Sequence, residues 1–152
     1  MNYYNPDIKD YMAKFPFVTS PEATLDEALD YMEKTGVRHL PVLRKGELVG
    51  VVSERDLMAG QSDDSKTVGD VMSGPPWVVA ETEPLSSVVH WMAKQKIGSA
   101  LVVNEAGKLL GIFTTTDALL ILSRMLGGGD FRDHYIGAEV GVHSHPIHLA
   151  VV

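Results

Sequence analysis

The chain carries the same seven-residue pattern twice. Residues 50–56 read Gly-Val-Val-Ser-Glu-Arg-Asp, and residues 111–117 read Gly-Ile-Phe-Thr-Thr-Thr-Asp. The similarity extends upstream at a spacing of 60 positions through Ile8 and Val68, Asp10 and Asp70, Met12 and Met72, Leu25 and Leu85, Met32 and Met92, and Val42 and Val102. The spacing within the motif is 61, which indicates one inserted residue in the second copy. A fixed long period over most of a chain predicts duplicated structural units.

Composition limits the architecture and the partners. With 152 residues and 45% hydrophobic content the chain can bury one good core, so we expect two intimately packed repeats rather than two independent domains. The absence of cysteine excludes a disulfide framework. A formal charge of −7 repels a phosphate backbone, so we expect no nucleic-acid partner. Neither a membrane-length apolar run nor a secretory pattern in residues 1–16 is present, so we expect a cytoplasmic protein without a membrane partner.

The first repeat predicts a strand, a helix, a hairpin and a second helix. Thr24 and Glu27 match a capping box, in which the two side chains satisfy free amides at the start of a helix. We expect a strand at 17–19, a helix from Leu25 to Gly36, hairpin strands at 39–43 and 48–52, and a short helix from Asp56 to Gly60.

The second repeat follows the same plan. We expect a strand at 77–79, an apolar helix face at Leu85, Val88, Val89 and Met92, strands at 100–103 and 109–113, and a helix at about 115–126. Pro84 replaces Thr24 and suits the first helical position. The predicted fold class is α/β (α+β), with two β-α-β-β-α units related by a pseudo-two-fold axis. By sequence, repeat one is 8–59, a linker is 60–67, repeat two is 68–126, and a Gly-rich hinge with a His-containing tail is 127–152.

The duplicated motif, the element order and the strands at 40–42 and 100–103 resemble a pair of CBS domains, over residues 8–126. This resemblance implies a Bateman module, in which two repeats pack through their sheets and form two clefts. Such clefts bind adenosyl ligands: AMP, ADP, ATP, S-adenosylmethionine or NAD. The resemblance also implies a flat homodimer and no catalytic domain. We therefore expect a regulatory protein rather than an enzyme, with no required cofactor.

The resemblance groups the candidate ligand-binding residues into two sets. The first set, for the first cleft, is Thr19, Val37, Arg38, His39, Ile112, Thr114 and Asp117. The second set, for the second cleft, is Val51, Ser53, Asp56, Val79, Ile97 and Ser99. We expect the second cleft to be weaker or selective for another ligand, because Val79 replaces the polar Thr19 and the second set has no cation.

The motif also has a direct chemical interpretation. Glycine at 50 and 111 would allow a flat ring or sugar to approach the strand. Aspartate at 56 and 117 offers two oxygens to vicinal ribose hydroxyls, and the hydroxyl residue with nearby free amides would hold a phosphate. The alternative is that Ser53 and Asp56, and their counterparts Thr114 and Asp117, are helix caps that need no ligand.

Other residues have structural alternatives. Arg38 suits a solvated surface as well as a phosphate, and His39 suits the core. Trp77 matches Phe17 and Trp91 matches Tyr31, which predicts packing or dimer-contact aromatics. The tail histidines His143, His145 and His148 are an alternative metal site, although we expect none, and a docking strand better explains the apolar residues beside them.

The sequence leaves three function classes. A regulatory module that senses an adenosyl ligand and transmits it to an unknown regulated protein is preferred. An enzyme is disfavoured because no catalytic triad, Walker loop or dinucleotide fingerprint occurs. A dimerising scaffold without a ligand is the alternative that the altered Val79 keeps open.

Overall fold

The computed structural model describes residues 5–127, and the tail histidines lie outside this range. The elements of the first half are a 3-10 helix at Ile8–Asp10, β1 at Ala13–Lys14, α1 at Leu25–Thr35, β2 at His39–Arg44, β3 at Glu47–Ser53 and α2 at Glu54–Gly60. Those of the second half are α3 at Val68–Val71, β4 at Val78–Ala80, α4 at Leu85–Gln95, β5 at Ser99–Val103, β6 at Leu109–Thr114 and α5 at Thr115–Met125. The mixed α+β fold confirms the predicted class.

The helices begin and end where local sequence chemistry predicts. The Thr24 hydroxyl accepts from the Glu27 amide at 3.1 Å, and the Glu27 carboxylate accepts from the Thr24 amide at 2.9 Å, so the predicted capping box starts α1. Gly36 ends α1 in the left-handed conformation at φ 72°. In the second repeat Lys96 takes this place at φ 56°. Two details differ from the sequence expectation: α2 begins at Glu54 rather than at Asp56, and Pro84 is the N-cap of α4 rather than its first helical residue.

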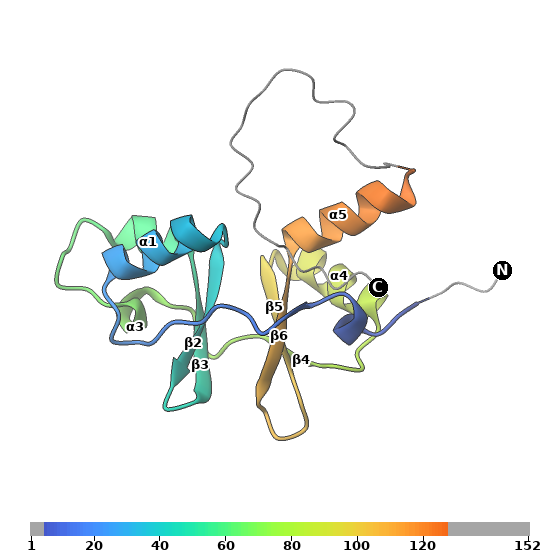
Figure 1. The fold of residues 1–152 in the computed structure, drawn as a ribbon, viewed down its shortest axis with the longest axis horizontal. Helices are drawn as coiled ribbons and strands as arrows, with labels where there is room; N and C mark the ends of the chain where they lie inside the picture. Colours follow the sequence, from blue (N-terminus) through green and yellow to red (C-terminus); the bar gives the residue numbers. More distant parts are fainter. Residues whose placement is uncertain (1–4, 128–152) are drawn as a thin grey trace, which may run out of the picture.

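Two antiparallel hairpins form the centre of the molecule. β2 pairs with β3 in a two-stranded sheet, and the other sheet has the order β1-β6-β5-β4. Figure 1 shows the two hairpins side by side, with α1 at one end of the molecule and α4 and α5 at the other. The strand expected at 17–19 is absent: Thr19 makes only an isolated parallel bridge to Val42, and Phe17 and Val18 before it are 47% and 37% exposed.

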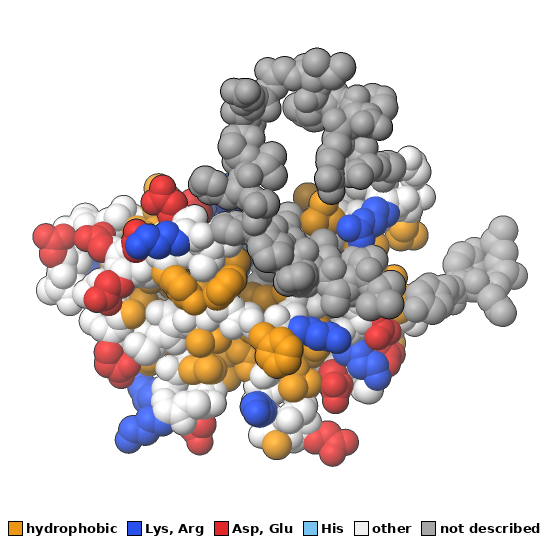
Figure 2. Space-filling model, viewed as in Figure 1, with side chains coloured by type: hydrophobic (Ala, Val, Ile, Leu, Met, Phe, Trp, Pro, Cys, Tyr) orange, Lys and Arg blue, Asp and Glu red, His pale blue; other side chains and the backbone are white. Residues whose placement is uncertain are grey.

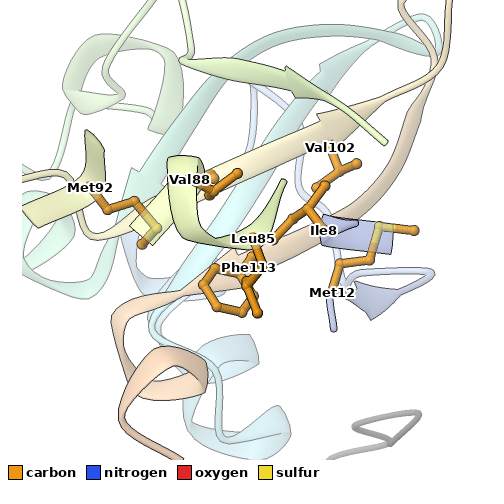
Figure 3. Close-up of a cluster of buried hydrophobic side chains, with 8 residues drawn as sticks. Ile8, Met12, Leu85, Val88, Met92, Val102 and Phe113 are labelled. Atoms are coloured by element: carbon orange, nitrogen blue, oxygen red, sulfur yellow. The ribbon is translucent and has the colours of Figure 1, made fainter. Parts of the chain in front are cut away.

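Each repeat completes the core of the other. Ile8 and Met12, which precede the first helix of repeat one, are buried with Leu85, Val88 and Phe113 of repeat two (Figure 3). Val68, which opens repeat two, is fully buried in the core of repeat one, where Met72 packs beside it; this core is built on Leu25, Ala28, Met32, Leu40, Val42, Val52 and Leu57. The two repeats are therefore interlocked by their first segments, and neither core is complete without the other repeat's chain.

Two short crossing segments carry this exchange. We call residues 13–19 the first crossing segment and residues 73–80 the second. The first segment exposes 93% of Phe15, 47% of Phe17 and 37% of Val18. Figure 2 shows hydrophobic side chains gathered on the face where this segment passes from one repeat to the other. Both crossing segments run from one repeat to the other. The resemblance to CBS domain pairs places the two sets of candidate ligand-binding residues in the same region, between the repeats.

Candidate functional site

The first crossing segment joins the two halves of the first set. At its start, Ala13 pairs with Ile112 on β6. At its end, the Thr19 amide donates to the Pro41 carbonyl at 3.0 Å, and the Thr19 carbonyl accepts from the Leu43 amide at 2.9 Å. Thr19 is thus held on β2 of repeat one by a segment that begins on β6 of repeat two, the strand that leads directly to Thr114.

The second crossing segment joins the second set in the same way. The amide of Val51 donates to the Ser73 carbonyl at 3.1 Å, and the amide of Ser73 donates to the Val51 carbonyl at 2.9 Å. Further along this segment, β4 places Val79 parallel to Val102 on β5. Residues of both repeats in each set are therefore linked by one short stretch of chain.

The duplicated motif forms helix caps in both repeats. The Asp117 carboxylate oxygen Oδ2 accepts from the Thr114 amide at 2.8 Å and from the Thr114 hydroxyl at 3.0 Å. Oδ2 of Asp56 accepts from the Ser53 amide at 2.9 Å, and the Ser53 hydroxyl accepts from the Asp56 amide at 3.1 Å. Both copies of the motif therefore cap a helix. Within residues 5–127 the other carboxylate oxygen, Oδ1, makes no hydrogen bond in either cap.

Asp117 is the more deeply placed of the two aspartates. Its exposed fraction is 8%, whereas Asp56 is half-buried. Burial raises the pKa of the Asp117 carboxyl above its ordinary value, because the charged form loses water, while the two hydrogen bonds from Thr114 act in the opposite direction. Because buried polar atoms in folded proteins are nearly always hydrogen-bonded, the unbonded carboxylate oxygen is a candidate acceptor for a further hydrogen bond.

The motif glycines do not have the function that the sequence suggested. A Cβ on Gly111 would lie 2.5 Å from Met12 Sδ and 2.8 Å from the Ala13 carbonyl oxygen. A Cβ on Gly50 would lie 2.6 Å from Met72 Sδ and 2.9 Å from the Ser73 carbonyl oxygen. The space beside each glycine is filled by a crossing segment and the methionine before it, so these glycines admit neighbouring chain and not a ligand ring.

His39 lies at the contact between the repeats. It is half-buried and sits opposite Ser53 in the strand register, and its Nε2 is 2.8 Å from the point that a Cβ on Gly98 would occupy. Burial lowers the pKa of the His39 imidazole; the Asp56 carboxylate partly offsets this effect, and Arg38 adds to it.

Strand register brings residues of the two sets next to each other within each repeat. His39 of the first set lies opposite Ser53 of the second set. Ser99 of the second set is 6% exposed and lies opposite Thr114 of the first set. The sequence-based prediction also missed Gly98 as the residue that makes room for His39. The signal was available, since Gly98 aligns with Arg38 at the spacing of 60 and removes a large side chain.

The remaining candidates are mostly packing or surface residues. Val37 packs against the core of repeat one and Val79 against the core of repeat two. Ile97 is half-buried, and Ile112 is 8% exposed. The side chain of Arg38 is 81% exposed, with its Nε 3.9 Å from the Glu54 carboxylate, so it is solvated in this structure.

The described part of the chain offers neither a metal centre nor a membrane span. No group of three or more His, Asp or Glu side chains within residues 5–127 is arranged to hold a metal ion. None of the helices in that same range is both long and apolar enough to span a membrane. The histidines that the sequence suggests as a metal alternative lie outside the described residues.

Two curated proteins resemble this chain over most of its length. The L-aspartate semialdehyde sulfurtransferase of Methanocaldococcus jannaschii is 29% identical over 122 residues, which are 80% of this chain and 23% of that protein. The inosine-5'-monophosphate dehydrogenase of Korarchaeum cryptofilum is 31% identical over 109 residues, which are 72% of this chain and again 23% of the relative. The chain therefore spans about a quarter of the length of these curated relatives.

Two solved structures cover almost the same span as this chain. The CBS domain pair of protein MJ0100, in complex with 5'-methylthioadenosine and S-adenosyl-L-methionine, superposes with a TM-score of 0.72 at 28% identity, covering 82% of this chain and 98% of that one. CBSX2 of Arabidopsis thaliana, solved in complex with AMP, superposes with a TM-score of 0.71 at 28% identity, covering 80% of this chain and 98% of that one.

The family model agrees with the internal duplication. The model of the CBS domain matches residues 8–63 and again residues 68–124. Each match contains one copy of the capped motif, and the solved neighbour from MJ0100 is likewise a CBS domain pair. This chain belongs to the CBS domain family, as a tandem pair.

Proposed function

We propose that this chain is a regulatory module that binds an adenosyl ligand between its two repeats. The observation that carries the proposal is the Asp117 cap: a buried carboxylate with one oxygen bonded to Thr114 and the other unbonded within residues 5–127. A ribose offers two vicinal hydroxyl donors, and a hydrogen bond to an ionised acceptor is about twice as strong as a neutral one. The ribose hydroxyls bind Asp117 Oδ1 in this proposal.

The ligand class rests on relatives. The CBS pair of MJ0100 was solved with two adenosyl compounds, and CBSX2 with AMP. Adenine and a ribose with vicinal 2'- and 3'-hydroxyls are common to all three ligands, so AMP and S-adenosylmethionine are the first candidates here.

The mechanism follows from the crossing segments. Thr19 and Asp117 belong to different repeats, and one ligand bound to both adds a second connection beside the first crossing segment. Binding then favours the arrangement of repeats in which both contacts form, and the population shifts by the difference in affinity between the two arrangements. We propose that the chain acts on a separate protein in this way and catalyses no reaction itself.

The first experiment is a thermal-shift scan of the full chain against AMP, ADP, ATP, S-adenosylmethionine, NADH and Zn²⁺. A ligand at 100 times its dissociation constant stabilises the folded state by about 2.7 kcal/mol, an easily measured shift. We expect a shift with an adenosyl compound that Asp117→Asn removes, because the neutral amide keeps the size but loses the ionised acceptor. A shift with Zn²⁺ alone would instead favour the metal alternative at the tail.

The control must separate loss of the cap from loss of the ligand. Asp70 closes the capping box of α3, accepting from the Thr67 amide at 2.8 Å, and belongs to neither set. Asp70→Asn should lower the ligand-free midpoint and leave the ligand-induced shift intact. Asp56→Asn tests the second cleft, which we propose to be weaker. If no compound shifts the wild-type midpoint, ligand sensing is refuted.

A homodimeric scaffold is the second candidate, and a surface feature favours it. Helix α5 and its C-cap carry a stripe of exposed apolar residues at helical spacing: Leu119, Leu122, Met125 and Leu126 are 63%, 49%, 79% and 78% exposed. Met58 on α2, which aligns with Leu119 at the spacing of 61, is 58% exposed. We propose that a second copy covers this stripe.

Oligomeric state tests the proposed dimer directly. Sedimentation velocity of the full chain should give a dimer, and Leu122→Glu should give a folded monomer, because a charge buried in an apolar interface is costly. Ser62→Glu on the exposed linker is the matched control and should leave the dimer unchanged. A wild-type monomer at all concentrations would refute the dimer.

A further inference from the structure

Repeat two has an open groove between β4 and α4. The groove has a volume of about 330 Å³ and is lined by Trp77, Val78, Glu83, Ser87 and Trp91, among others. Trp91 is 48% exposed and Val78 43%, so two large apolar side chains meet solvent at this place. Neither tryptophan belongs to the two sets of candidate ligand residues.

The aromatic pair at the same place in repeat one packs against itself. Phe17 and Tyr31, which align with Trp77 and Trp91 at the spacing of 60, pack edge to face with ring centroids 5.6 Å apart. An edge-to-face arrangement is a favourable geometry for two aromatic rings. Trp77 and Trp91 form no such ring pair within residues 5–127 and line the groove instead.

A charge accompanies the opening of the groove. Glu83 lines it in repeat two, whereas the aligned residue of repeat one is Ala23. Glu83 is half-buried, and its carboxylate makes no ion pair or hydrogen bond within residues 5–127, although its backbone carbonyl accepts from the Ile8 amide at 2.8 Å. Three substitutions between the repeats, at 77, 83 and 91, thus converge on one place.

This combination selects for a cation on an apolar stem. Indole has the most favourable face for a cation among the aromatic side chains, and the Glu83 carboxylate supplies the opposite charge. Arginine fits better than lysine, because its planar guanidinium stacks on an aromatic face while donating to a carboxylate. The chain's formal charge of −7 also favours approach by a basic partner. We propose that the groove between β4 and α4 binds an arginine side chain presented by a basic segment of a partner protein.

The groove is independent of the proposed nucleotide clefts. It shares only Val79 with the two sets, and the side chains that carry the argument, Trp77, Glu83 and Trp91, are outside both. Failure of adenosyl binding would leave the groove proposal untouched. The groove also offers a direct reporter, because the chain contains two tryptophans and both line it.

The test is a tryptophan fluorescence titration of the full chain with the peptide acetyl-Gly-Arg-Gly-amide. The matched probe is the same peptide with citrulline, which has the shape of arginine without its charge. We expect a saturable change of emission with arginine, and an affinity for the citrulline peptide that is lower by about three- to fivefold, as for a partly exposed charge pair. Glu83→Gln should reduce arginine binding by a similar factor.

The experiment includes a matched variant and has three contrary outcomes. Glu81→Gln, two residues away and outside the groove, should bind like wild type, and matching unfolding midpoints establish that the variants are folded. Equal binding of the two peptides, or no effect of Glu83→Gln, would overturn the cationic assignment. An emission that changes with protein concentration alone, without peptide, would show that a second copy fills the groove and would likewise overturn the proposal.

Discussion

Gly111→Ala should destabilise the ligand-free protein. The new Cβ would meet Met12 Sδ at 2.5 Å, Met12 Cγ at 2.8 Å and the Ala13 carbonyl oxygen at 2.8 Å. The methionine end can move, but the carbonyl belongs to the backbone of β1, which is held on β6 by only two residue pairs. The substitution therefore pushes the first crossing segment away from β6 and draws Met12, which is 5% exposed, out of its core.

The magnitude follows from opposing effects. Overpacking of this kind costs about 1–3 kcal/mol, while the loss of glycine freedom in the unfolded chain returns about 0.4–1 kcal/mol. We expect a net loss of about 1–2 kcal/mol in the free energy of unfolding. Each kcal/mol corresponds to a fall of roughly 2–8 °C in the midpoint for chains in this range of sizes.

Urea unfolding without ligand is the appropriate assay, and a double-mutant cycle locates the cause. Met12→Ala removes the sulfur that the new methyl group meets, so Gly111→Ala should cost less in that background, and the two changes should be coupled. A Gly111→Ala variant within about 0.5 kcal/mol of wild type, a margin typical of harmless substitutions, would refute the reasoning. It would favour the alternative in which the glycine makes room for a ligand.

Three further predictions follow from the differences between the repeats. Lys96→Gly should raise the stability by about 0.5–1 kcal/mol in thermal unfolding, because Lys96 has the left-handed conformation that Gly36 has in repeat one. Gly36→Ala should lower the stability by about 1 kcal/mol for the same reason. Opposite signs for these two effects would contradict the conformational argument. Gly98→Ala should lower the stability by about 1 kcal/mol in urea unfolding, since its Cβ would meet the His39 ring. In a His39→Ala background the same substitution should cost less. An equal loss in both backgrounds would show that His39 is not the group that the new Cβ meets. The pKa of His39 in the folded protein lies below its ordinary 6.5, so the unfolded chain takes up the proton first as the pH falls. The free energy of unfolding should therefore decrease as the pH drops below about 7 toward the folded pKa. Urea midpoints should show this pH dependence weakened by His39→Gln and kept by His90→Gln, a change on the exposed face of α4.

Short-range contacts account for the elements and their ends, which a sequence pattern can predict. The Thr24 capping box, the Gly36 stop and both hairpins involve residues close together in the chain, so their energetics depend on neighbours that the pattern contains. The duplication likewise predicted two units of one plan. The predicted position of Pro84 inside α4 and the predicted strand at 17–19 were wrong, because neighbouring segments decide the backbone hydrogen bonds at both places.

The same distinction between short-range and tertiary contacts applies to the candidate site. Ser53 with Asp56 and Thr114 with Asp117 could be recognised as caps from spacing alone, since each pair closes a turn of its own chain. The deeper burial of Asp117 could not be recognised in this way, because burial depends on which other segments pack around the cap.

What only the tertiary structure decided is which distant groups meet. Met12 fills the space at Gly111, and His39 fills the space at Gly98. No periodicity encodes these contacts, because they form between segments whose positions are set by the packing of both cores together. For the same reason the sequence determined that two repeats exist, whereas the structure alone showed that each core is completed by the first segment of the other.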